Sequence, residues 1–253
     1  MAFAVSADAY DRFMGRYSTR LAPLFADFAG VAAGMRVLDV GCGPGALTAE
    51  LVRRAGAEDV AAIDPSESFV AAARERHPGV DVRRAAAEEL PFGDGELDAA
   101  LAQLVVHFMA DPPAGIAEMA RVTRAGGTVA ACVWDYEGGR TPLSLFWRAA
   151  LELDPVTRDE SDRAGARQGA LPEFLSAAAL RDVEETLLAF DIEHATFDEW
   201  WDPFALGVGP AGSYVRSLDP DRLAKLRERC RELAGDPPLV LPAAAWAARG
   251  RVG

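Results

Sequence analysis

Short apolar runs alternate with helix-like segments along residues 36–134, and this alternation restricts the possible folds more than any other feature of the sequence. The runs show no internal alternation of apolar and polar residues, which is typical of strands buried on both faces. Strands that are separated by helices pair in parallel through right-handed crossovers. The sequence therefore predicts an α/β fold with a Rossmann-like, mostly parallel sheet and helices on both faces. The expected strands are Arg36–Val40, Val60–Ile63, Val80–Arg84, Leu97–Ala102 and Thr128–Trp134, the expected helices are Ala46–Ala55, Glu67–Arg76 and Pro113–Thr123, and Arg124–Gly127 is expected to be a turn.

The segments on either side of this alternation are less regular. Residues 1–33 predict a helical lid, because aromatic and apolar side chains recur there at spacings of three and four. Residues 154–170 are charged and glycine-rich, and we expect them to be mobile. A last strand that returns to the sheet makes 1–253 one domain, with a lid (1–33), a cofactor-binding core (35–135), a substrate cap with the sixth strand (136–238) and a last strand (239–253). Helices are expected over Leu143–Leu153, Glu173–Leu180, Phe197–Phe204 and Arg222–Leu233, and strands six and seven over Val183–Glu193 and Leu239–Val252.

Charge and composition exclude several kinds of partner. The net charge of −13 disfavours a nucleic-acid surface, which needs clustered lysine and arginine. The three cysteines are far apart and predict neither disulfides nor a metal site. No uncharged apolar run approaches the ~20 residues of a membrane span, and the first residues lack a signal pattern. We therefore expect a cytoplasmic monomer or homodimer that binds neither nucleic acid nor a membrane.

The turn after the first strand, in the stretch VLDVGCGPG, predicts a ligand site. Gly41, Gly43 and Ala46 fit the loose dinucleotide pattern G-x-G-x-x-G/A. Asp39 stands two residues before the first glycine, where a carboxylate repels a pyrophosphate and favours an ammonium or sulfonium. Pro44 removes one N–H from the loop that would hold a phosphate. The turn therefore favours a ligand with a cationic end, and S-adenosylmethionine has both cations.

Asp64 ends the second expected strand about 20 residues past the turn, where an acid can accept both ribose hydroxyls. The alternative is that Asp64, Pro65 and Ser66 merely turn the chain and cap the next helix. Together with the turn, the ligand interpretation is favoured.

Four stretches resemble the class I S-adenosylmethionine-dependent methyltransferases, and more narrowly the type 11 family: LDVGCGPG, AIDPS, AAAEELPFGDGELD and TRAGG. The resemblance covers about residues 35–135, and YDRFMGRYS and AWAARGRV also resemble bacterial members. It implies S-adenosylmethionine as cofactor, S-adenosylhomocysteine as product, and an antiparallel seventh strand. Relatives often carry an acid at the position of Ala86, so adenine contacts fall here to the Ala87 backbone and the Glu88 side chain. The other cofactor contacts it implies are Asp39, Gly41, Cys42, Gly43, Gly45, Asp64, Pro65, Ser66 and Gln103.

Residues outside the cofactor motifs are candidates for closing the site and binding the acceptor. In the lid, Tyr10 and Arg16 are expected to cover the cofactor, with Arg16 near its carboxylate; packing of an amphipathic helix on the sheet is the alternative. His107 is the candidate base, against packing beside the cofactor. Asp135 and Tyr136 follow the fifth strand and are further catalytic candidates. Aromatic candidates for an apolar acceptor pocket, or alternatively for ordinary core, are Trp134, Trp200, Trp201, Phe204 and Tyr214.

The functional prediction is methyl transfer to an O, N or C atom of a small molecule, in specialised metabolism. Catalysis would be by in-line displacement, with proximity and desolvation as the main contributions. The alternatives are an NAD-dependent oxidoreductase, which Asp39 and Pro44 disfavour, and a non-catalytic cofactor-binding or assembly protein, which Ala86 leaves open. Non-methyl chemistry on the same fold, such as cyclisation, is a fourth possibility.

Overall fold

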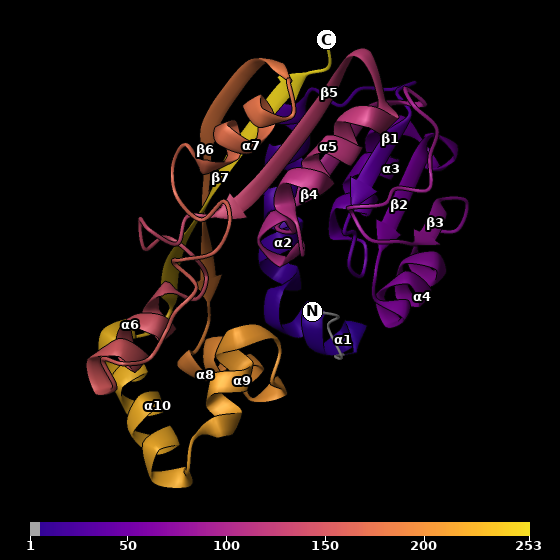
Figure 1. The fold of residues 1–253 in the computed structure, drawn as a ribbon. Helices are drawn as coiled ribbons and strands as arrows, with labels where there is room; N and C mark the ends of the chain where they lie inside the picture. The colour runs from indigo at the N-terminus through magenta and orange to yellow at the C-terminus, as the bar shows by residue number, and fades with distance from the viewer. Residues whose placement is uncertain (1–5) are drawn as a thin grey trace.

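The computed structural model describes residues 6–253, and a seven-stranded sheet lies at its centre (Figure 1). The strand order is β3-β2-β1-β4-β5-β7-β6. β7 pairs antiparallel with both β5 and β6, and the other neighbouring strands pair in parallel. The predicted α/β class with an antiparallel seventh strand is confirmed. The strands are β1 (Val37–Val40), β2 (Val60–Asp64), β3 (Asp81–Arg84), β4 (Leu97–Gln103), β5 (Thr123–Trp134), β6 (Arg181–His194) and β7 (Leu239–Arg251).

Helices cover both faces of the sheet because successive strand residues point to opposite sides. Val37 and Leu101 pack with residues of α2 and α3 on one face. Leu38 and Ala100 pack with residues of α5 and α7 on the other. The helical segments are α1 (Ala7–Tyr10), η1 (Asp11–Gly15), α2 (Arg16–Ala29), α3 (Ala46–Ala55), η2 (Ala57–Asp59), α4 (Glu67–Arg76), η3 (Val106–Phe108), α5 (Pro112–Val122), α6 (Ser144–Leu153), α7 (Ala170–Ala177), α8 (Phe197–Trp201), η4 (Asp202–Leu206), α9 (Gly209–Ser217) and α10 (Pro220–Ala234).

The strands β6 and β7 are long and extend past the rest of the sheet to a group of helices at one end of the molecule (Figure 1). This group, which we call the cap, consists of α6, η4, α8, α9 and α10. The ring of Phe146 in α6 stacks on that of Phe204 in η4 at a centroid distance of 4.5 Å. The Phe204 ring also lies 5.4 Å from that of Phe13 in η1, and the cap aromatics belong to the same apolar cluster as α2 and α3. The cap is therefore joined to the rest of the molecule by this cluster as well as by β6 and β7.

The structure corrects two local predictions. Arg124–Gly127, expected to be a turn, lies within β5; the register moves from Leu97 opposite Thr123 to Ala99 opposite Thr128, so these residues form a bulge instead of a chain reversal. The helix α9 over Gly209–Ser217 was not predicted, because two glycines and a proline obscure its periodicity.

The outer segments of the prediction agree with the structure in part. Residues 7–29 are helical as expected, while 1–5 lie outside the described residues. Residues 154–169 hold no helix or strand, yet Glu160 among them is buried. Within the described chain, none of the helices has the length and apolar character needed to span a bilayer.

Candidate functional site

The glycine turn after β1 uses its own N–H groups to hold the end of β2. The N–H groups of Gly41 and Cys42 donate to the Ile63 carbonyl at 2.8 and 2.9 Å. The N–H of Gly43 donates to Asp64 Oδ2 at 2.9 Å. The turn is thereby fixed to the neighbouring strand, with the Asp64 carboxylate beside it.

The last two residues of the turn complete this pattern. Pro44 has no N–H, and the N–H of Gly45 donates to the Cys42 carbonyl at 3.0 Å. Every N–H group of residues 41–45 therefore has a partner within the protein. A pyrophosphate would need those groups, so the turn cannot cradle one as a dinucleotide-binding loop does.

Gly41 is required at its position by both conformation and space. Its φ of +71° lies in the left-handed region, and a Cβ there would stand 2.5 Å from Cγ2 of Val105. Gly43 also has a positive φ, of +54°, but a Cβ there would meet nothing within 4 Å. The backbone is therefore packed against Val105 on one side and open to the cavity on the other.

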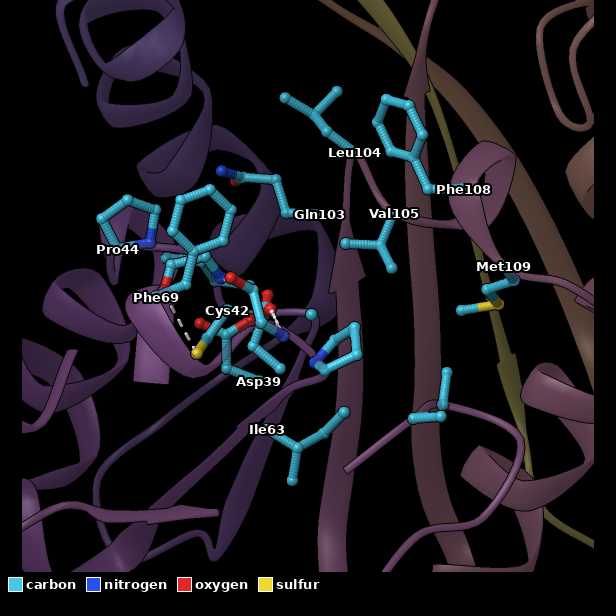
Figure 2. A pocket seen from close by; sticks show the side chains of 18 of the residues that line it. Asp39, Cys42, Pro44, Ile63, Phe69, Gln103, Leu104, Val105, Phe108 and Met109 are labelled. Atoms are coloured by element: carbon cyan, nitrogen blue, oxygen red, sulfur yellow. Dashed lines mark hydrogen bonds between the residues drawn. The ribbon is translucent and has the colours of Figure 1, made fainter. Parts of the chain in front are cut away.

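A cavity of about 230 Å³ opens at the carboxyl ends of β1, β2 and β4, where open parallel sheets bind ligands. Asp39 and Gln103 reach it from β1 and β4, and Val105, Phe108 and Met109 face it from the segment after β4 (Figure 2). We call it the cofactor cavity. The predicted cofactor residues that line it are Tyr10, Asp39, Gly41, Cys42, Gly43, Asp64, Pro65, Ser66, Ala87, Glu88 and Gln103.

Two buried carboxyl groups give this cavity its electrostatic character. Asp39 Oδ2 accepts from the Thr48 hydroxyl at 2.6 Å, yet burial raises the pKa of Asp39 to about 7. Asp64 accepts from the N–H groups of Gly43 and Ser66 at 2.9 and 2.8 Å, and burial raises its pKa too. Cationic and hydroxyl groups are the ligand groups that these acceptors favour.

Gln103 adds a buried acceptor. Its Nε2 donates to the Ser18 carbonyl at 3.2 Å, and its Oε1 has no hydrogen-bond partner within residues 6–253. A buried amide oxygen without a donor costs free energy, which a donor on a ligand would recover. Asp39, Asp64 and Gln103 together fit the ammonium, sulfonium and ribose hydroxyls of S-adenosylmethionine.

The expected adenine side of the cavity lacks a free carboxylate. Ala86 is exposed, and Glu88 Oε1 accepts from the N–H groups of Ala110 and Asp111 at 2.7 and 3.1 Å. Glu88 therefore fastens the segment after η3, while Phe69 and Met109 provide apolar surface nearby. On this side of the cavity, an adenine ring would contact apolar side chains more than a hydrogen-bonding carboxylate.

A second, smaller cavity of about 40 Å³ adjoins the first, and we call it the acceptor cavity. Tyr10, Leu104 and Phe108 line both cavities. Leu104 has a φ of +62°, a strained conformation for a leucine and one that is concentrated at functional sites. Predicted residues that line the acceptor cavity are Trp134, His107 and Tyr136, and Glu160 joins them.

Two predicted cofactor-binding positions lie outside both cavities. Arg16 lines neither cavity; it donates to His194 Nδ1 and pairs with Glu199, both at 2.7 Å, so its guanidinium is held by these partners. Gly45 also lies outside the cavities, where a Cβ would strike the His77 ring.

Asp135, a predicted catalytic residue, is buried in a structural network. It accepts from the Gly138 N–H at 3.0 Å, from Arg140 Nε at 2.7 Å and from Trp246 Nε1 at 2.9 Å. It lines neither cavity. The residue therefore joins the loop after β5 to β7.

The downstream aromatic residues predicted to bind the acceptor lie in the cap. They line neither the cofactor cavity nor the acceptor cavity, and three of them are buried among one another. This arrangement favours the alternative of ordinary core for Trp200, Trp201, Phe204 and Tyr214.

Sequence reasoning missed several residues of the site. Phe69 lies on the third residue of α4, and Phe108 and Met109 belong to the segment after β4, where an apolar run gave no sign of facing a ligand. Glu160 lies in a charged stretch that resembled a solvated loop. Within residues 6–253, no three His, Cys, Asp or Glu side chains gather as a metal site would require.

Comparison with known proteins places the chain among methyltransferases. A family profile described as methyltransferase domain matches residues 38–131. An uncharacterized methyltransferase of Mycobacterium bovis is 33% identical over 186 residues, which cover 74% of this chain and 70% of that protein. Malonyl-(acyl-carrier protein) O-methyltransferase of Pectobacterium atrosepticum is 33% identical over 147 residues, 58% of this chain and 56% of that protein.

The fold agrees with this result. Geranyl diphosphate C-methyltransferase from Streptomyces coelicolor, solved with Mg²⁺, geranyl diphosphate and S-adenosyl-L-homocysteine, gives a TM-score of 0.54. The alignment covers 92% of this chain and 78% of that one at 16% identity, a likeness of fold alone. On its sequence relatives, its motifs and its sheet order, the chain belongs to the class I S-adenosylmethionine-dependent methyltransferases.

Proposed function

We propose that this protein binds S-adenosylmethionine in the cofactor cavity and methylates a small molecule held in the acceptor cavity. The observation that carries the proposal is the glycine turn, whose N–H groups all have partners while Asp39 and Asp64 stand beside it. This arrangement suits a cationic ligand with ribose hydroxyls and opposes a pyrophosphate. It therefore favours a methyltransferase over an NAD-dependent oxidoreductase.

Each part of the cofactor cavity has a proposed role. Asp39 and Gln103 hold the ammonium end, and Asp64 accepts from the ribose hydroxyls. Phe69 and Met109 pack against the base, since no free carboxylate lies there. When bound, S-adenosylmethionine supplies a methyl group that is already activated on its sulfonium sulfur.

The protein contributes mainly position and exclusion of water. Tyr10, Leu104 and Phe108 line both cavities, so an acceptor in the second cavity would lie next to the bound cofactor, and proximity would be the main contribution to in-line displacement. The acceptor is proposed to be a small molecule of specialised metabolism, because the acceptor cavity is small and enclosed by buried apolar side chains.

The test combines the cofactor carrying an isotope-labelled methyl group with purified protein and an extract of small molecules. We expect one or a few small molecules to gain the labelled methyl group, as read by mass spectrometry. The Asp64→Ala variant, with its weakened cofactor site, serves as the matched control. Stabilisation by NADH and not by S-adenosylmethionine would contradict the assignment, and tight cofactor binding without any labelled product would favour a non-catalytic role.

A further inference from the structure

Three polar side chains interrupt the apolar wall of the acceptor cavity, and each comes from a different segment. His107 lies in η3, Tyr136 follows β5, and Glu160 lies between α6 and α7. The rest of the wall is aromatic or aliphatic apart from the hydroxyl of Tyr10. These three groups therefore set which acceptor the cavity can hold.

Glu160 is the most constrained of the three. Its side chain is 2% exposed, accepts from Trp147 Nε1 at 3.2 Å, and lies 3.3 Å from Arg163 Nε. Tyr136 lines the same cavity, where burial and the nearby Glu160 carboxylate raise the pKa of its hydroxyl. Arg163 in turn donates to the His107 carbonyl at 3.4 Å, so the loop that carries Glu160 is fastened to η3.

The negative charge of Glu160 is balanced by the positive charge of Arg163. Arg163 neutralises Glu160 without lining the cavity itself, and no other charged side chain lines it. An anionic acceptor would find no cation there, and a cationic one would meet a carboxylate that already has a partner. The cavity therefore favours an uncharged acceptor.

His107 has an unused hydrogen-bonding atom. Its ring is 8% exposed, and its Nδ1 has no partner in the part of the chain that the structure describes. The ring centroid lies 6.1 Å from that of Tyr136. A buried polar atom of this kind at a cavity wall marks a place where a ligand completes the hydrogen bonding.

We propose that the acceptor cavity takes the hydroxyl group of an uncharged, mainly apolar molecule such as a phenol, with Tyr136 and Glu160 receiving its proton and His107 bonding the acceptor. This rests on the proposed function, which supplies the methyl donor on the other side of Phe108.

The proton and the methyl group move in opposite directions. The acceptor oxygen forms a bond to the methyl carbon as the bond from that carbon to sulfur breaks, and the electron pair stays on sulfur. The hydroxyl proton passes to the Tyr136 oxygen, and the Tyr136 proton passes to the Glu160 carboxylate. Burial raises the pKa of Glu160 and lowers that of His107 to about 3, so Glu160 is the better proton acceptor of the two.

The closed cavity is too small for an aromatic ring, which needs roughly 150 Å³. Tyr10, Phe13 and Met14 form its wall on the side of α1 and η1. These segments are short, with only four and five residues, and η1 is a π-helical turn, a form common at functional sites. This wall is therefore the one that an entering acceptor displaces.

The experiment uses fluorine NMR on protein saturated with S-adenosylhomocysteine, after calorimetry has measured the affinity of that ligand. The probes share one ring: para-fluorophenol, para-fluorobenzylamine, para-fluorobenzoate and para-fluoroanisole. We expect para-fluorophenol to bind at least fivefold more tightly than the amine or the benzoate. Tyr136→Phe and Glu160→Gln should each weaken its binding at least threefold and leave para-fluoroanisole unchanged, whereas Tyr214→Phe should change neither.

The outcomes separate this inference from the proposed function. No binding of S-adenosylhomocysteine would overturn the cofactor site, and the probes are therefore titrated without it as well. Absence of para-fluorophenol binding, equal binding of a charged probe, or equal losses of phenol and anisole in Tyr136→Phe would each overturn the hydroxyl site. Equal losses would mean that Tyr136 merely shapes the cavity.

Discussion

The burial of Asp39 determines both its protonation and the kind of ligand that it favours. The group is 1% exposed, and one hydrogen bond from the Thr48 hydroxyl does not offset its desolvation, so its pKa rises from 3.8 to about 7. A folded-state pKa above the unfolded value means that the folded protein binds more protons between these two pH values. The ionised form is thus costly until a cationic ligand arrives.

This cost predicts a pH dependence that Asp39→Asn should remove. As pH rises from 3.8 to about 7, the ligand-free protein should lose stability through this group, by up to about 4 kcal/mol at 1.36 kcal/mol per pKa unit. Urea unfolding of both proteins across that range gives the difference. Equal pH profiles of the two proteins would show that the carboxyl is already ionised without cost.

Ligand binding should show the same linkage. A bound cation lowers the pKa of Asp39, so S-adenosylmethionine should release a proton and bind more tightly as pH rises towards about 7. Calorimetry in two buffers with different ionisation enthalpies measures the proton count. The Asp39→Asn variant should bind at least tenfold more weakly and release no proton.

Asp64 should contribute affinity through hydrogen bonds to the ligand and through the turn. Asp64→Ala removes the acceptor for the Gly43 N–H, and we expect cofactor affinity to fall by about 1–3 kcal/mol. Glu67→Ala is the matched control, since its side chain is exposed and pairs only with Arg84 at 3.5 Å. Unchanged calorimetric affinity in Asp64→Ala would rule out the ribose role.

Among the elements, α2 is joined to β6 by a buried histidine. His194 Nδ1 accepts from Arg16 at 2.7 Å, and its Nε2 lies 2.9 Å from the Tyr17 hydroxyl. Burial and Arg16 lower the pKa of His194 from 6.5 to about 4. The helix α2 is thus held to β6 by the His194 ring, which must stay neutral to keep these contacts.

The consequence is acid sensitivity. Between about pH 4 and 6.5, His194 is protonated in the unfolded chain and neutral in the folded protein. The free energy of unfolding should therefore fall as pH falls through this window, by up to about 3 kcal/mol. A His194→Phe variant, which cannot titrate, should be less stable at neutral pH but should lack this part of the slope. Parallel urea titrations of the two proteins measure it, and identical slopes would contradict it.

The cap elements should be separable from cofactor binding. Phe204 is 2% exposed and stacks on Phe146, so Phe204→Ala should destabilise the protein by about 3–5 kcal/mol. Because Phe204 lines neither cavity, the folded variant should bind S-adenosylhomocysteine with unchanged affinity. Denaturant unfolding and calorimetry below the transition give both values. A large loss of affinity for S-adenosylhomocysteine would instead indicate that Phe204 contributes to the cofactor site.

Elements built from local patterns could be predicted from sequence, and elements that depend on distant contacts could not. The strand before the Gly41 turn is apolar on both faces, and its place in the sheet follows from that pattern. Whether Arg124–Gly127 forms a turn or a bulge within β5 depends on pairing with β4, and no local sequence pattern shows that pairing. The aromatic residues around Trp200 suit a pocket or a core equally well, and only the packing of the cap decides between them.

The same difference between local patterns and distant contacts decides which residues of the candidate site could be predicted. Asp39 and Asp64 could be placed because they lie at or next to the carboxyl ends of their strands, and these ends meet at one edge of a parallel sheet. Glu160 could not, because its burial depends on Arg163 and Trp147 meeting it across a loop without regular structure. Arg16 was assigned to the ligand, but the partners that hold it lie in β6 and α8.

For the whole molecule, we expect the core and the cap to unfold in one transition because β6 and β7 run through both and one apolar cluster joins them. S-adenosylhomocysteine at one hundred times its dissociation constant should add about 2.7 kcal/mol, a rise of roughly 5–10 °C in Tm. Scanning calorimetry measures both. Two separate transitions, only one of them shifted by the ligand, would contradict the coupling.

The position of β7 between β5 and β6 also bears on the order in which the protein is made. During synthesis β5 and β6 leave the ribosome well before β7, and β7 is the strand that pairs with both. Until it arrives, β5 and β6 each present an unpaired edge, which in a nascent chain attracts other strands. Completion of the sheet therefore waits on the emergence of residues 239–251, and a chain stalled before them would be a substrate for chaperones.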